Sequence, residues 1–106
     1  MFDRILHRLR EKVRTGQYVM SDHAEEQMDE DGLEIFDVKQ VILTGKIIER
    51  QRDHQTNEWK YLVQGATLVG REAVLVTKLS FTGKLVIITV YSTTRGNCYE
   101  ETSDGL

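Results

Sequence analysis

The chain has 106 residues, of which 40% are hydrophobic and 29% charged, a length and composition typical of one globular domain. It contains no run of 18 apolar residues, and its single cysteine, Cys98, excludes an internal disulfide. We therefore expect a cytoplasmic protein with no membrane partner. Residues 1–106 are predicted to form a single domain, with helices in about 1–45, a sheet in about 46–92 and a short tail at 93–106.

The charges are segregated along the chain, although the net charge is only −3. Residues 22–38 carry eight acidic side chains and no basic one, whereas residues 39–99 carry nine basic and four acidic side chains. A basic body with one acidic segment permits binding to a phosphate backbone but does not establish it.

The N-terminal half predicts three helices. Phe2–Arg14 has apolar residues spaced by three or four positions, and Gly16 follows where a C-terminal cap is expected. Two further helices are predicted over Asp22–Glu30 and Ile35–Leu43, each followed by a glycine. Between the first and second helices, Tyr18–Met20 fits either a short strand or an extended connection.

After Gly45 the apolar spacing becomes typical of strands. Segments rich in β-branched and aromatic residues are separated by short polar or glycine-containing turns, the first of them over 53–57, which favours an antiparallel meander. The predicted strands begin at Ile47 and continue with Trp59–Val63, Ala73–Ser80 and Leu85–Tyr91. The expected fold class is therefore α+β, with two to three N-terminal helices packed on a four-stranded antiparallel sheet.

His23 opens the acidic segment and has two interpretations. It is either an ordinary residue at a helix start or a general acid/base, since histidine is the side chain that titrates near neutral pH. The acidic residues after it are either a solvated helix face, a cation site or a mimic of nucleic acid. His7, His54 and Cys98 lie in other elements, so we predict no metal and no cofactor.

The predicted strands offer a second group of candidate residues, in which cations accompany tyrosines. Arg50, Lys60 and Lys78 fall on three successive strands and are expected to converge on one exposed face. Such a face suits metal-free cleavage of RNA, which needs a base, an acid and cations for the developing charge. The alternative is an ordinary solvated sheet surface. The whole group comprises Arg50, Lys60, Lys78, Lys84 and Arg95 with Tyr61, Tyr91 and Tyr99.

The order and spacing of several short motifs resemble those of the domain-of-unknown-function 4258 family over roughly residues 5–91. These are "HA…M…GL" beginning at His23, "DV…I…G.IIE" beginning at Asp37, and the closing "VIITVY" over 86–91. In that family the position after the histidine–alanine pair is often basic, whereas Glu25 and Glu26 are acidic here. The family looks related to the RelE-, BrnT- and MqsR-like toxins of toxin–antitoxin pairs.

That resemblance implies a RelE/MqsR-like fold and a metal-independent endoribonuclease that acts on mRNA, with RNA and a cognate antitoxin, for which a zinc-finger type is one candidate, as partners. The alternative is a non-catalytic protein-interaction module of the same fold. Gln64 joins Lys60, Lys78 and Tyr91 as the nearest match to the catalytic set of the MqsR-type toxins. The predicted site residues are His23, Lys60, Lys78 and Tyr91 for catalysis and Arg50, Lys84 and Arg95 for RNA binding.

Overall fold

Helices dominate the first half of the chain and strands the second in the computed structural model, which describes residues 2–92. The first half contains α1 (Asp3–Arg14), β1 (Tyr18–Met20), α2 (Asp22–Asp31) and α3 (Ile35–Thr44). The second half contains β2 (Lys46–Asp53), β3 (Glu58–Ala66), β4 (Glu72–Leu79) and β5 (Leu85–Ser92). None of the helices within the described range is long and apolar enough to span a membrane.

The strands form one sheet in the order β1-β5-β4-β3-β2. The last four strands pair antiparallel as the predicted meander, which confirms the α+β class. The sheet has five strands rather than four, because β1 pairs with β5 in parallel, with Tyr18 opposite Leu85 and Met20 opposite Ile87. Such a pair joins segments more than 60 residues apart, so no local pattern in the sequence specifies it.

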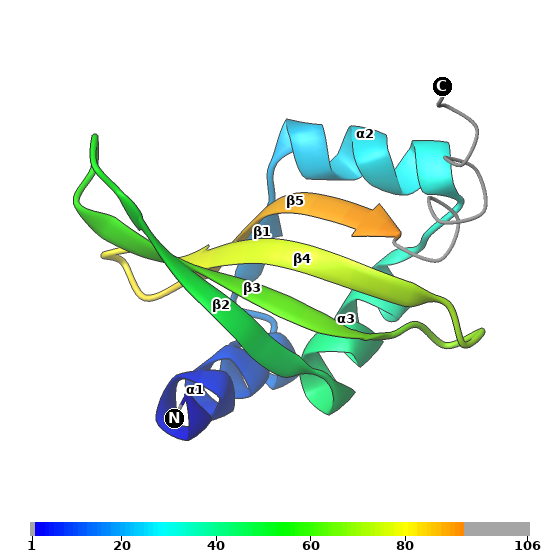
Figure 1. The fold of residues 1–106 in the computed structure, drawn as a ribbon, viewed down its shortest axis with the longest axis horizontal. Coiled ribbons are helices and arrows are strands. Elements are labelled where there is room, and N and C mark those ends of the chain that lie inside the picture. The colour runs from blue at the N-terminus through cyan, green and yellow to red at the C-terminus, as the bar shows by residue number, and fades with distance from the viewer. Residues whose placement is uncertain (1, 93–106) are drawn as a thin grey trace.

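The hydrophobic core lies between the sheet and the helices α1 and α3, and Ala24 and Met28 of α2 belong to the same core (Figure 1). Leu9 of α1 and Ile42 of α3 are fully buried, as are Leu75 of β4 and Leu85 of β5. In α1 and α3 the buried apolar residues recur three or four positions apart, and in β4 Ala73, Leu75 and Thr77 are buried at alternate positions, so each element presents one side to the core. The opposite face of the sheet is not covered by α1 or α3.

The third helix, α2, packs beside β5, where β1 ends and the strand edge is unpaired (Figure 1). Gln27 Oε1 accepts a hydrogen bond from the amide of Val90 at 2.9 Å, and Asp31 Oδ2 accepts one from the amide of Ser92 at 3.2 Å. The hydroxyl of Ser21 donates to the carbonyl oxygen of Ile88 at 2.8 Å. Side chains of α2 therefore satisfy backbone groups that an edge strand otherwise leaves open.

Candidate functional site

One face of the sheet points away from α1 and α3, and we call it the outer face. Side chains alternate along a strand, so the burial of Tyr61 in the core places Lys60 and Leu62 on the outer face. The register extends this face to β4, where Lys78 lies opposite Lys60 and Val76 opposite Leu62. The outer face therefore has an apolar centre and a charged end.

Four charged residues form this end, and we call Asp53, Glu58, Lys60 and Lys78 the lysine–carboxylate cluster. Asp53 lies opposite Glu58 across the β2–β3 pair, and Lys60 lies opposite Lys78 across the β3–β4 pair. Each lysine forms an ion pair with one of the carboxylates: Lys60 Nζ lies 3.7 Å from Asp53 Oδ2, and Lys78 Nζ lies 2.8 Å from Glu58 Oε1. The four side chains are 21–31% exposed, so solvent screens their charges only in part.

Asp53 is held as a carboxylate by its surroundings. The backbone amide of Gln55 donates to its Oδ1 at 3.0 Å, and this hydrogen bond lowers the pKa of Asp53 below its usual value of 3.8. Hydrogen bonds from Thr56 and the charge of Lys60 lower the pKa further, against the opposing effect of partial burial. The cluster therefore contains an ionised carboxylate beside an ammonium group at neutral pH.

Three of the predicted cations lie at this end of the sheet. Lys60 and Lys78 face each other, and Lys84 precedes Leu85, which pairs with Leu79 next to Lys78. Lys84 is exposed in the β4–β5 turn. The structure thus brings together two predicted catalytic lysines and one predicted RNA-binding lysine.

Gln64 and Tyr91 lie at the other end of the outer face. Both are opposite Val74, which pairs with Gln64 on one side and with Tyr91 on the other. Gln64 is four residues from Lys60 along β3, a separation of about 13 Å in an extended strand. These two candidates therefore belong to a different part of the face from the lysines.

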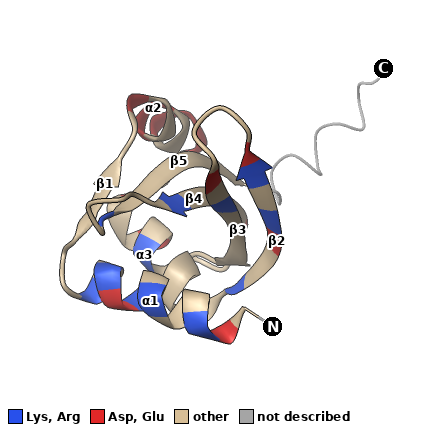
Figure 2. Cartoon of the chain, turned by 90° about the vertical axis from the view of Figure 1, so that its left-hand side faces the viewer, with Lys and Arg blue, Asp and Glu red and all other residues tan. Residues whose placement is uncertain are grey.

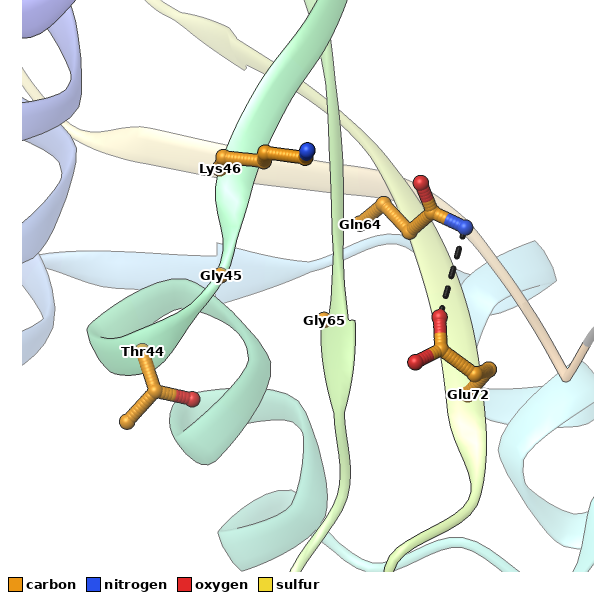
Figure 3. Close-up of a pocket in the computed structure, with 6 residues that line it drawn as sticks. All are labelled: Thr44, Gly45, Lys46, Gln64, Gly65 and Glu72. Carbon is orange, nitrogen blue, oxygen red and sulfur yellow. Dashed lines mark hydrogen bonds between the residues drawn. The ribbon is translucent and has the colours of Figure 1, made fainter.

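A polar hollow of about 340 Å³ lies at that other end, where α3 meets the strands (Figure 3). Gln64 Nε2 donates to Glu72 Oε1 at 3.3 Å within it. A Cβ atom on Gly65 would lie 2.9 Å from the Cα of Gly45, so two glycines are needed for the close packing of backbone here. The lining residues are Thr44, Gly45, Lys46, Gln64, Gly65 and Glu72. The hollow offers hydrogen-bonding groups but no histidine or cysteine.

Arg50 does not join the lysines, and its expected convergence with Lys60 and Lys78 is wrong. It lies opposite Tyr61, whereas Lys60 lies opposite the next residue, Gln51. Adjacent residues of a strand point to opposite faces, so Arg50 is on the helix-bearing side of the sheet. There its guanidinium carbon lies 4.0 Å from the centre of the Trp59 ring.

His23 is exposed in the first turn of α2. It is one helical turn before Gln27, whose side chain binds the edge of β5. Because β5 lies between α2 and β4, a whole strand separates the helix of His23 from Lys78. Arg95, predicted to bind RNA, lies outside the described residues, as do Cys98 and Tyr99.

Sequence reasoning missed both carboxylates of the cluster. Asp53 was assigned to the polar segment 53–57, which was expected to be a turn, whereas it ends β2 and Glu58 begins β3. The connection between the strands is therefore residues 54–57, and pairing outward from it places Asp53 opposite Glu58 and Gln51 opposite Lys60. A turn that is one residue longer shifts this register, so the expected turn did not reveal the two carboxylates.

No group of three or more His, Cys, Asp or Glu side chains within residues 2–92 is arranged to hold a metal ion. Ammonium and carboxylate groups are the reactive groups that these residues bring together on the outer face. Such groups transfer protons and stabilise negative charge on a phosphate.

The fold and the outer face define a small α+β protein, in which residues 2–92 form three helices and a five-stranded, mostly antiparallel sheet. Residues 20–92 match the model of the domain of unknown function DUF4258, and the chain belongs to that family. The matched region covers α2, α3 and β2–β5 and therefore contains the whole lysine–carboxylate cluster. No curated protein and no solved structure matches the chain.

Proposed function

We propose that this protein is a toxin-like, metal-independent endoribonuclease that acts on mRNA, with the lysine–carboxylate cluster as its reaction centre. The supporting observation is the pair of ammonium groups on neighbouring strands, each beside a carboxylate and partly shielded from water. This arrangement supplies proton acceptors, proton donors and positive charge within one small area. The relation to RelE/MqsR-like toxins remains part of the proposal.

The chemistry follows from what each group of the cluster can do. A carboxylate, Glu58 or Asp53, accepts the proton of a ribose 2′-hydroxyl, and the 2′-oxygen attacks the adjacent phosphorus. The ammonium groups of Lys60 and Lys78 stabilise the extra negative charge on the phosphate oxygens. One lysine donates a proton to the 5′-oxygen as the phosphorus–oxygen bond breaks. The products are a 2′,3′-cyclic phosphate and a 5′-hydroxyl.

His23 and Tyr91 take no part in these proton transfers, because they lie away from the cluster. Their predicted catalytic roles are tested by His23→Gln and Tyr91→Phe, which we expect to leave the rate of RNA cleavage within about twofold of wild type. A loss of about 100-fold in the cleavage rate would contradict this assignment: in His23→Gln it would indicate a reaction centre at α2, and in Tyr91→Phe one at the far end of the outer face.

A cognate antitoxin is the second proposed partner. A protein that covers the outer face would block the cluster from RNA, as a toxin–antitoxin pair requires. The alternative function, a non-catalytic interaction module, has one observation in its favour: each lysine of the cluster is already paired with a carboxylate. A purely structural role for these ion pairs would explain that arrangement equally well.

Induced expression in bacteria, followed by inspection of total RNA, distinguishes the two functions. We expect growth arrest and RNA fragments with 5′-hydroxyl ends, and purified protein should produce the same fragments in the presence of EDTA. Intact RNA with correctly folded protein would overturn the enzyme and favour the interaction module. Cleavage that EDTA abolishes would contradict the metal-independent mechanism.

A further inference from the structure

Two arginines and a tryptophan form a stack on the helix-bearing side of the β2–β3 hairpin. The guanidinium carbon of Arg50 lies 4.0 Å from the centre of the Trp59 ring, and that of Arg52 lies 5.1 Å from it. Arg52 also donates to the side-chain oxygen of Asn57 through Nε and Nη2. Trp59 is partly buried against the core and therefore gives the stack a fixed base.

Stacking leaves the hydrogen-bonding groups of Arg50 available. A guanidinium group contacts an aromatic ring through its flat surface, whereas its N–H groups point outward in the plane. Arg50 is exposed and makes no ion pair within residues 2–92. Its two parallel N–H donors match the oxygens of a phosphate, and the ring beneath restricts their orientation before any ligand arrives.

A second cation lies beside the same tryptophan. Arg8 of α1 and Trp59 both line a hollow of about 270 Å³, together with Ser80, just after β4, and Glu58, whose carboxylate is paired with Lys78. The basic residues of α1 and β2 are separated in space from the acidic residues of α2, as Figure 2 shows. An anionic chain that approaches Trp59 therefore meets positive charge from two elements and avoids the acidic helix.

We infer that Arg50, Arg52 and Trp59, with Arg8 across the hollow, bind the backbone and bases of single-stranded RNA. Phosphates are held by the arginine N–H groups, and an unpaired base stacks on the exposed part of the indole or on a guanidinium plane. A duplex hides its bases and lacks this second contact. An acidic peptide would use the charges but would gain nothing from the aromatic ring.

This inference deepens the proposed function and rests on RNA as the ligand. β2 is an edge strand, and Arg50 and Gln51 are neighbours that point to opposite faces of it. Gln51 lies opposite Lys60, so only the thickness of the sheet separates the arginine site from the lysine–carboxylate cluster. Within residues 2–92 no strand pairs with the other edge of β2, so an RNA strand held at Arg50 can pass around that edge to reach the cluster.

Binding is measured by fluorescence anisotropy with a labelled single-stranded RNA whose riboses are all 2′-O-methylated. Methylation prevents attack by the 2′-oxygen, so affinity is measured independently of cleavage. We expect Arg50→Gln to weaken binding by about five- to tenfold and to reduce the salt dependence by about one ion. Arg50→Lys should restore only part of the affinity, because an ammonium group lacks the planar pair of donors.

Lys39→Gln is the matched control. Lys39 also lies over aromatic rings, at 5.9 Å from the Tyr18 centroid and 5.7 Å from that of Phe36, but Tyr18 belongs to β1 at the opposite edge of the sheet. The Lys39→Gln substitution removes one positive charge, as Arg50→Gln does, and we expect it to change RNA affinity by less than about twofold. Unfolding curves for both variants should show that each is folded under the conditions of the assay.

Several results would overturn the inference. These are equal binding by Arg50→Gln and Lys39→Gln, equal binding of the matching RNA duplex, or displacement of RNA by poly-glutamate at similar charge concentration.

The proposed nuclease and the proposed RNA-binding site fail in different ways. Wild-type protein that binds methylated RNA but never cleaves unmodified RNA would contradict the nuclease and support the binding site. Cleavage of unmodified RNA, with no effect of Arg50→Gln on affinity, would support the nuclease and contradict the binding site.

Discussion

Asp37 holds the start of α3 and a distant loop with one buried carboxylate. Its Oδ2 accepts from the amide of Glu34 at 2.9 Å, which completes a capping box, and its Oδ1 accepts from the amide of Leu68 at 3.2 Å. At the other end of α3, Arg10 donates to the carbonyl oxygens of Ile42 and Gly45, at 3.1 and 2.9 Å. Both residues thus have structural roles.

We expect Asp37→Ala to lower the free energy of unfolding by about 1–3 kcal/mol, because two backbone amides lose their acceptor. Asp37→Asn keeps an acceptor oxygen and should cost less. Urea denaturation measures both, with Asp29→Ala, at an exposed position of α2, as the control. Equal stabilities of Asp37→Ala and Asp29→Ala would contradict the structural role.

Asp53 gives a pH-dependent prediction. Its pKa is lowered in the folded protein, first by the amide of Gln55, so ionised Asp53 favours folding above the ordinary pKa of 3.8. This contribution is lost as the pH falls through the lower, folded-state pKa. Wild-type protein should therefore melt at a higher temperature than Asp53→Asn at pH 7, and the difference should shrink below about pH 4. A difference that is constant down to pH 2 would show that ionisation of Asp53 is not its cause.

At the scale of secondary structure, the helices were predicted within one residue at most ends, because glycines and apolar spacing mark them. The predicted helix 22–30 is observed as Asp22–Asp31, and the predicted helix 35–43 as Ile35–Thr44. The parallel pairing of β1 with β5 was not predictable, since it joins segments more than 60 residues apart in the folded sheet. The role of α2 was hidden for the same reason: its Gln27 and Asp31 bind an edge that only the folded sheet creates.

Gln27 should protect the edge of β5 from exchange with solvent. We expect Gln27→Ala to speed hydrogen–deuterium exchange at the amide of Val90 by at least about tenfold, because that amide loses its acceptor in the native state. Glu26→Ala, at an exposed neighbouring position, should leave the rate unchanged. The assignment of α2 as an edge cover would be wrong if both variants exchanged alike at Val90.

At the scale of the whole molecule, the sheet separates two basic surfaces that the sequence suggested were one. Lys60 and Lys78 were predicted to share a face, and they do, because their register follows from short turns on either side. Arg50 was misplaced because its face depends on the exact length of the turn, which was expected over 53–57 but comprises residues 54–57. The carboxylates of Asp53 and Glu58 were missed because their importance lies in the pairing across strands and not in any motif.

The central claim is that the lysine–carboxylate cluster cleaves RNA, and the most direct measurement is the rate at which purified protein cleaves single-stranded RNA in EDTA. Wild-type protein is compared with the double variant Lys60→Gln/Lys78→Gln and with Lys39→Gln, after all three are shown to be folded. We predict a loss of at least about 100-fold in the double variant and wild-type cleavage by Lys39→Gln. Equal cleavage by all three proteins, or none by wild type, would contradict the claim.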